Sequence, residues 1–196
     1  MIDPKRLEIL PTFSRNAPLS LLVFVILTYF FNPTYHNFYI VILMILLFPL
    51  NMILKYIIFK PIYKLFNKTT LPILGLGSRP PGAVGCDISL VKKNTNFGFP
   101  SGHAQIVWTF GIYSCFKFYK TFLINKDTYK PVIYYLSYIF LIMSFGFCFL
   151  IMLYVSYSRV YIEKCHTIQQ VIAGSIIGAT TGFLAYYYED YILSKI

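Results

Sequence analysis

Long apolar stretches separated by short polar segments dominate this chain. Each stretch approaches the roughly 20 residues that a helix needs to cross a bilayer, and each is bounded by polar residues, proline or glycine. The pattern predicts an all-α fold, a polytopic membrane helical bundle of about five spans. We take residues 1–196 as a single domain, with residues 1–16 as an N-terminal interfacial segment. The expected spans are Ala17–Phe31, Tyr39–Phe59, Ser101–Ile124, Pro131–Tyr157 and Thr167–Tyr188.

The connection between the second and third stretches, Lys60–Pro100, is polar and rich in glycine and proline. We expect a loop there, with a short helix over Ile62–Asn67. A loop of this length in a small protein is usually functional.

Helices that cross the membrane in alternate directions sort the polar stretches between the two ends of the bundle. If one helix begins at Ser101, the next returns to the same face at Arg159, and the last leaves that face at His166. Arg79 and His103 then lie on this face as well. An odd number of spans places the N-terminus on this face and the C-terminus opposite.

Three glycines of the last stretch, Gly174, Gly178 and Gly182, repeat at four-residue spacing. On a helix they share one face, and small residues on one face allow close packing of a neighbouring membrane helix. We therefore expect this face to be an interface.

Composition and charge narrow the class of protein. The chain is 57% hydrophobic and only 12% charged, whereas soluble domains carry about 25% charged residues. The net charge of +10 fits anionic lipid headgroups or an anionic substrate. Nucleic acid is not an expected partner, because no basic run or recognition helix is free of the apolar segments. The N-terminus lacks the small-residue cleavage site of a secretory signal peptide.

Two histidines at the expected bundle end have the chemistry for cleaving a phosphate ester. His166 suits the nucleophile, because a neutral imidazole can form a phosphoryl-histidine intermediate. His103 suits the acid that protonates the leaving oxygen. Gln170 lies one helical turn after His166, so its side chain can orient the imidazole.

Other residues of the same stretches suit a phosphate cradle. Arg79 and Arg159 offer planar guanidinium groups for phosphate. Ser158, Ser101 and the backbone at Gly102 supply further donors, the latter two at a helix start. No cluster of acidic residues, cysteine and histidine has the spacing of a Zn²⁺ or Mg²⁺ site, so we expect neither a metal nor another cofactor.

These residues together resemble the three-part motif of the type-2 phosphatidic acid phosphatase superfamily, integral membrane phosphatases of lipid phosphates. The resemblance extends over roughly residues 60–182. It implies that His166 is the nucleophile, His103 the general acid, and Arg79 and Arg159 phosphate ligands, without a metal. The matching motifs are Arg79-Pro80, Pro100-Ser101-Gly102-His103 and Ser158-Arg159 followed by His166.

Within the superfamily the chain is most similar to dolichyl-diphosphatases. Glutamine at position 170, where most members have aspartate, is typical of that branch and of glucose-6-phosphatases. The resemblance implies a long polyprenyl diphosphate as substrate. It is carried by His103-Ala104-Gln105, Trp108, Ser158-Arg159-Val160-Tyr161, His166-Thr167, Gln170-Val171 and Gly174.

Two departures from the family motifs bear on activity. The first motif usually has a lysine seven residues before its arginine, a position held here by Pro72, and Lys64 or Lys68 are the candidate substitutes. The third motif usually has five residues between arginine and histidine, and here there are six. In a loop the insertion is tolerable, but in a helix it would rotate His166 by about 100°.

The leading hypothesis is a metal-independent membrane lipid phosphatase that hydrolyses a lipid phosphate or dolichyl diphosphate through a phosphohistidine. The alternative is a catalytically weak lipid-phosphate-binding or structural membrane protein that retains the phosphate cradle. A permease is disfavoured because the polar residues gather at one bundle end rather than at the midplane. The expected partners are a lipid phosphate and membrane lipids, and a homo-oligomer is left open.

The expected location is the endoplasmic reticulum or another internal membrane. Positive-inside counting places the site in the cytoplasm, whereas the family resemblance implies the lumen, which we prefer. Cys86 and Cys165 fall on the active-site face, either as a disulfide or as two free thiols. A disulfide requires Cα atoms within about 7 Å and would favour the lumen.

Overall fold

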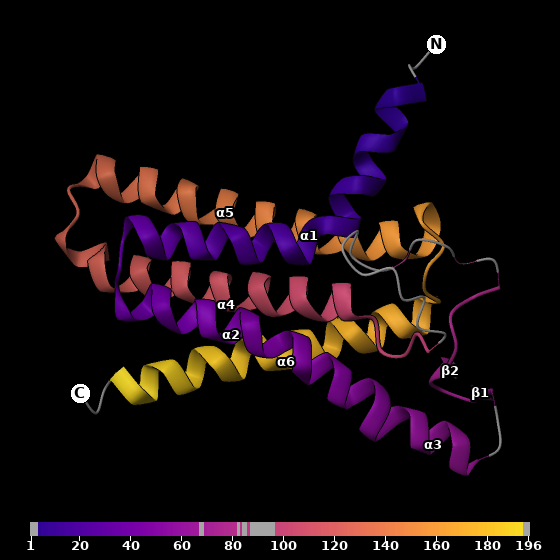
Figure 1. Cartoon of the computed structure of the whole chain (residues 1–196). Helices are drawn as coiled ribbons and strands as arrows, with labels where there is room; N and C mark the ends of the chain where they lie inside the picture. The colour runs from indigo at the N-terminus through magenta and orange to yellow at the C-terminus, as the bar shows by residue number, and fades with distance from the viewer. Residues whose placement is uncertain (1–3, 67–68, 82, 84–85, 87–96, 194–196) are drawn as a thin grey trace.

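The computed structural model describes residues 4–66, 69–81, 83, 86 and 97–193, with side chains from residue 13 onward. Helices account for most of this part of the chain (Figure 1). Two of them, α2 and α5, continue into short π-helices. The elements are α1 (Pro4–Phe31), α2 (Tyr35–Ile53), a π-helix (Leu54–Phe59), α3 (Lys60–Leu65), β1 (Thr70–Leu71), β2 (Gly75–Leu76), α4 (Gly102–Asn125), a 3₁₀ turn (Lys126–Thr128), α5 (Pro131–Tyr157), a second π-helix (Ser158–Ile162) and α6 (Ile168–Leu193).

Four helical segments of the described chain are long and apolar enough to cross a membrane. They confirm the expected all-α polytopic bundle, and the chain is an integral membrane protein. Helix α1 begins at the same end of the bundle as the β-hairpin, and α6 ends at the opposite end, as the alternating threading predicts (Figure 1). The four segments are Phe13–Phe31, Tyr35–Leu65, Pro131–Ile162 and Ile168–Ile192.

Helix α4 lies at the centre of the bundle. It packs against α1, α2, α5 and α6, and its 24 residues extend about 36 Å at 1.5 Å per residue, enough for a bilayer core. Its polar residues Gln105, Thr109 and Ser114 are buried within the bundle. The expected span Ser101–Ile124, the third in chain order, is therefore the central helix of the bundle.

The glycine face predicted on α6 lies directly on α4. A Cβ atom added at Gly174, Gly178 or Gly182 would collide with the backbone carbonyl oxygen of Ser101, Gln105 or Thr109, respectively. Successive glycines of α6 thus meet carbonyl groups that are four residues apart at the start of α4 and along it. This register confirms the predicted interface, and it fixes the start of α4 against the start of α6.

We expect Gly178→Ala to destabilise the bundle by about 1–3 kcal/mol, because the added methyl meets a backbone atom that cannot move aside as a side chain can. Thermal unfolding of the purified protein in detergent measures the loss. Gly146→Ala on α5 is the matched control, since a Cβ there meets nothing within 4 Å. Equal unfolding temperatures for the two variants would contradict the close α4–α6 contact.

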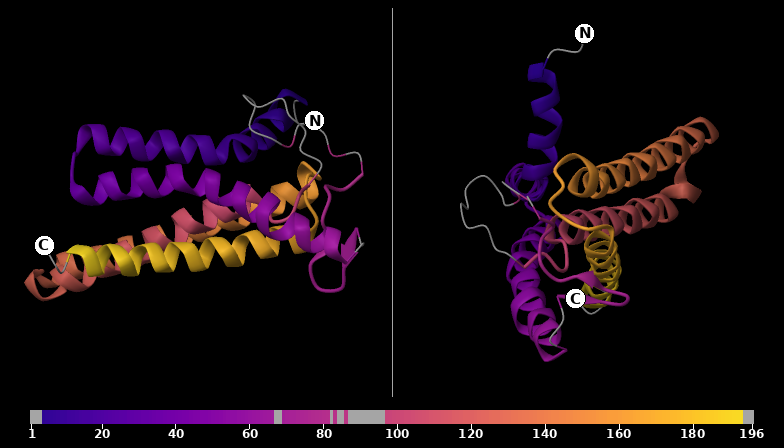
Figure 2. Two further views of the ribbon diagram at one scale, coloured as in Figure 1. Left: turned by 60° about the horizontal axis from the view of Figure 1, so that its bottom comes forward. Right: turned by 90° about the vertical axis from the view of Figure 1, so that its right-hand side faces the viewer.

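The long connection after α2 is more structured than the sequence predicts. The expected short helix is present as α3, but it continues the helix that contains Lys55 instead of standing alone. Strands β1 and β2 form an antiparallel hairpin in which Thr70 pairs with Leu76, and Ser78 forms a β-bridge with Phe97. The right-hand view of Figure 2, in which this end faces the viewer, shows the hairpin and the α5–α6 connection gathered there.

A second polar cluster closes the opposite end of the bundle. The fully buried carboxylate of Glu189 on α6 accepts hydrogen bonds from Tyr113 at 2.8 Å and Lys117 at 3.1 Å. Its other oxygen lies 2.8 Å from Nδ1 of His36. The cluster joins α2, α4 and α6 far from the predicted motifs.

Candidate active site

His166 lies between the second π-helix and α6, and its ring is held by Gln170. Nδ1 of His166 is 2.9 Å from Oε1 of Gln170. The Gln170 amide can point only one way, because its Nε2 donates to the carbonyl oxygens of Leu76 and Ser78, both at 2.7 Å. Oε1 therefore accepts from His166, so Nδ1 carries the ring proton and Nε2 bears the lone pair. The orienting role predicted for Gln170 fits this geometry.

The surroundings of His166 keep its ring neutral. Burial, followed by the positive charges of Arg159, Lys55 and Arg79, holds the pKa of His166 well below its ordinary value of 6.5. A neutral imidazole with its lone pair on Nε2 is the nucleophilic form.

His103 lies in the first turn of α4 and is held by α1. Its Nε2 is 2.8 Å from the backbone carbonyl oxygen of Arg15. A carbonyl can only accept, so Nε2 carries a proton. The neighbouring Ser101 N–H donates to the carbonyl oxygen of Gln170 at 3.0 Å, which joins the second motif to the start of α6. The two predicted histidines therefore belong to one site.

Ser101 provides an unsatisfied hydroxyl at this site. The residue is fully buried, and its Oγ makes no hydrogen bond within the described part of the chain. It caps the N-terminus of α4, where backbone N–H groups and the helix dipole favour an anion. Next to it, a side chain at Gly102 would collide with Asn51 of α2. A phosphate oxygen is the kind of acceptor that this hydroxyl needs.

Two predicted arginines converge on the histidines. Arg159 is fully buried, and its Nη2 donates to the carbonyl oxygen of Cys86 at 2.5 Å. Arg79 lies beside Gln170, since a Cβ placed on Gly98 would meet the side chains of both. The charges of both arginines act on His166.

A third cation, Lys55, was not among the expected site residues. It lies in the first π-helix, is only 8% exposed, and places its charge near His166. Asn51, one turn earlier, anchors this helix by donating to Oε1 of Gln105 at 2.7 Å. The signal was present in the sequence, because a lone lysine inside an apolar span is costly and usually functional.

The lysines expected to replace the missing first-motif cation are not seen at the histidines. Lys64 is exposed on α3 and lines a separate cavity of about 320 Å³ with Lys60 and Ser78. Lys68 lies outside the described residues. Of the lysines that the structure describes, Lys55 is the one whose charge acts on the two histidines.

The additional residue of the third motif is absorbed by a wide turn. The N–H of Glu163 donates to the carbonyl of Ser158 at 2.8 Å, the five-residue spacing of a π-turn. Lys164 then adopts a left-handed conformation, with φ of 51°. The N–H groups of Cys165 and His166 both return to the carbonyl of Arg159, at 3.0 and 3.1 Å. The inserted residue therefore does not rotate His166 about a helix axis, because the second π-helix ends at Ile162, before His166.

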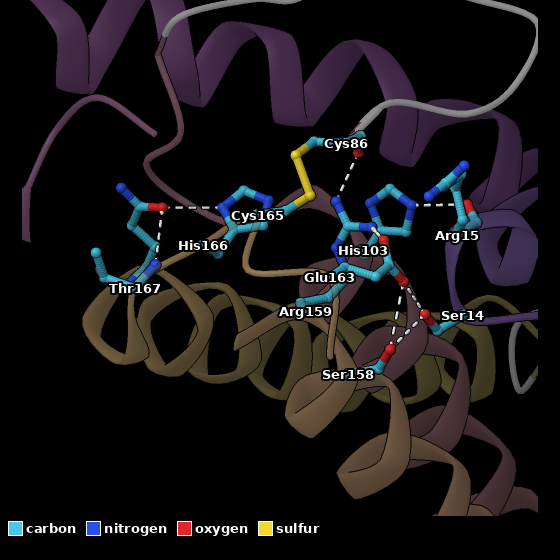
Figure 3. Close-up of a disulfide and its surroundings, with 11 residues drawn as sticks. Ser14, Arg15, Cys86, His103, Ser158, Arg159, Glu163, Cys165, His166 and Thr167 are labelled. Atoms are coloured by element: carbon cyan, nitrogen blue, oxygen red, sulfur yellow. Dashed lines mark hydrogen bonds and ion pairs between the residues drawn. A yellow bond between two sulfur atoms is a disulfide. The ribbon is translucent and has the colours of Figure 1, made fainter. Parts of the chain in front are cut away.

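Ser158 and Glu163 connect the third motif to α1 (Figure 3). Oγ of Ser158 lies 2.7 Å from Oγ of Ser14 and donates to Glu163 at 3.3 Å. Glu163 also forms an ion pair with Arg159 and accepts from Ser14. The Ser158 hydroxyl is thus engaged by protein atoms, and its expected contact with phosphate stays a prediction. Neither Ser14 nor Glu163 was foreseen.

A disulfide between Cys86 and Cys165 confirms the pairing that the sequence left open. The Cα atoms are 5.5 Å apart. The bond links the residue before His166 to the residue whose carbonyl holds Arg159 (Figure 3). Within the described residues, no group of three or more histidine, cysteine or acidic side chains could hold a metal ion.

Comparison with known proteins confirms the family resemblance that the sequence motifs indicate. The family model of the PAP2 superfamily matches residues 65–193, and the chain belongs to this superfamily. Over 100 residues the chain is 34% identical to "Dolichyldiphosphatase 1" of Dictyostelium discoideum, which covers 51% of the chain and 39% of that protein. The chain therefore matches well under half the length of this relative. No solved structure matches the chain.

Proposed function

We propose that this protein is a metal-independent lipid phosphatase that hydrolyses a polyprenyl diphosphate or a related lipid phosphate. The observation that carries the proposal is the tautomer of His166, fixed by Gln170 so that Nε2 has its lone pair beside buried cations. The similarity to a dolichyldiphosphatase supports a diphosphate at the end of a long isoprenoid.

The proposed reaction has two steps. Nε2 of His166 bonds to phosphorus while the bond from phosphorus to the leaving oxygen breaks, and His103, as an imidazolium, gives one ring proton to that oxygen. Water then attacks phosphorus, the bond from phosphorus to Nε2 of His166 breaks, the now neutral His103 takes a proton from the water, and inorganic phosphate leaves. Arg79, Arg159 and Lys55 stabilise the charge on the phosphoryl oxygens in both transition states.

The disulfide supports a luminal site. Cys86 and Cys165 lie on the active-site end of the bundle, and disulfides persist in oxidising compartments such as the lumen of the endoplasmic reticulum. We propose that the histidines face this lumen, in agreement with the orientation that we preferred from the sequence. The disulfide would also restrict the loop before α4, typically by about 2–4 kcal/mol of stabilisation.

One observation favours the alternative, a weak binder of lipid phosphates. Arg159 is already paired with an internal carboxylate, Glu163. A substrate panel separates the two functions: dolichyl diphosphate, undecaprenyl diphosphate, phosphatidic acid and glucose 6-phosphate, each with the purified full chain. We expect phosphate release from the lipid substrates. Binding of phosphate without release from any of the four would favour the alternative.

We further expect that a chelator leaves the rate of phosphate release unchanged, because the proposed chemistry uses only imidazole and cationic side chains. The same panel, assayed with and without EDTA, measures this directly. Loss of activity on chelation that Mg²⁺ restores would refute the metal-independent mechanism.

A further inference from the structure

Glu163 is an acidic residue in an unusual place. It lies immediately after the second π-helix, in the third-motif segment that is one residue longer than in the family, and its side chain is only 2% exposed. A buried carboxylate is costly unless it is paired and hydrogen-bonded. Its partners therefore indicate what it does.

Both carboxylate oxygens of Glu163 are engaged. Oε2 pairs with Nη1 of Arg159, whose side chain is fully buried. Oε1 accepts from the hydroxyl groups of Ser14 and Ser158. Figure 3 shows this chain of contacts leading from α1, through the carboxylate, to the guanidinium. The guanidinium is held on its other side by the carbonyl of Cys86, so two separate groups fix its position.

The negative charge of Glu163 also offsets part of the positive charge around the histidines. Arg159, Lys55 and Arg79 bring three positive charges to the buried histidines. Of the other carboxylates that the structure describes, Asp127 lies in the turn after α4, and Glu189 and Asp190 lie near the end of α6, at the opposite end of the bundle. Within the described residues, Glu163 is thus the counter-charge for these cations before an anion binds.

Resting on the function proposed above, we propose that Glu163 is a positioning residue that orients Arg159 toward the substrate phosphate, and that Ser14 of α1 holds Glu163 for this task. The carboxylate fixes the guanidinium, which favours catalysis. It also lowers the positive charge of the site, which weakens the binding of phosphate and so favours product release. Glu163 therefore raises the turnover rate and at the same time lowers the affinity of the site for phosphate.

The test compares Glu163→Gln with the wild-type full chain in detergent. The amide keeps the shape of the side chain and one acceptor oxygen but loses the charge. We expect kcat to fall about tenfold, because Arg159 is held less firmly. The Kd for orthovanadate, a phosphate mimic, should fall about fivefold, because the site gains one positive charge. KM should fall with it.

Glu189→Gln is the matched control. It removes another buried carboxylate, at the far end of the bundle, so it should leave the vanadate Kd and KM unchanged. If Glu163 had a purely structural role, Glu163→Gln would reduce the amount of active protein, and the vanadate Kd and the KM of the remaining active protein would stay as in the wild type. Unchanged kcat and Kd in Glu163→Gln would overturn the proposal.

Ser14 provides the second, milder variant. Ser14→Ala should lower kcat as Glu163→Gln does but by less, while the vanadate Kd stays as in the wild type because the carboxylate keeps its charge, and Ser14→Thr should restore kcat. If Glu163→Gln does not fold, these two variants decide the question, and a wild-type kcat in Ser14→Ala would overturn the proposal. If the wild type binds vanadate but releases no phosphate from any substrate, the proposed function is refuted. The comparison of vanadate Kd between the wild type and Glu163→Gln then still tests the effect of Glu163 on the charge of the site.

Discussion

Replacing His166 with alanine is expected to lower kcat by at least about 10⁴-fold, because the variant has no atom that can form the covalent intermediate. The fold should persist, since His166 lies in a connection at the end of the bundle and its main-chain hydrogen bond to Arg159 is retained. Phosphate release from dolichyl diphosphate measures the loss. Rapid acid-free quenching with labelled substrate should trap a phosphorylated protein in the wild type and none in the variant.

His36→Ala is the histidine control. His36 lies at the opposite end of the bundle, beside Glu189, so its loss should leave turnover within a few-fold of wild type. A His166→Ala protein with near wild-type activity would remove His166 from the mechanism. The depressed pKa of His166 adds a second check. The ring stays neutral as pH falls below 6.5, so the acid limb of kcat/KM that reports this group should lie below that value.

Lys55→Met is expected to reduce kcat/KM by about 10²–10³-fold, the usual cost of removing one preorganised charge from a site that stabilises developing negative charge. The unfolding temperature should not fall in parallel. Lys55 is a buried cation whose charge acts on His166 together with those of Arg159 and Arg79, and an apolar side chain of similar length removes the cost of burying that charge. Activity and stability therefore separate in this variant.

Lys64→Met is the matched control for Lys55→Met. Lys64 is exposed and lines a different cavity, so its replacement should change kcat/KM by less than about threefold, as for most surface substitutions. Equal losses in the two variants would show that the missing first-motif cation comes from both lysines. A loss confined to Lys64→Met would restore the interpretation based on sequence spacing.

Features set by local sequence were predictable. The helices follow from apolar stretches, and the gathering of His103, Arg159 and His166 at one end follows from counting alternating crossings. The glycine interface follows from four-residue periodicity. These inferences need only the helix repeat and the bilayer thickness, so they hold before any tertiary contact is known.

Features set by contacts between distant segments were not predictable. Lys55 precedes Arg79 by more than twenty positions, and only the structured connection between them brings both to the histidines. Ser14 and Glu163 meet although 149 positions of the chain separate them. The cluster of His36, Tyr113 and Glu189 likewise depends on how three helices are rotated about their axes, which apolar periodicity alone does not fix.

The disulfide also reports how far membrane insertion has advanced while the chain is being synthesised. Cys86 precedes α4, whereas Cys165 follows α5, and 79 positions separate them. Translation runs from the N-terminus, so the bond can close only after this intervening hairpin has entered the membrane and returned to the starting side. A chain that stalls earlier carries Cys86 as a thiol. The oxidised pair is therefore a chemical mark that the α4–α5 hairpin has been inserted, which a non-reducing gel of nascent chains of increasing length can follow.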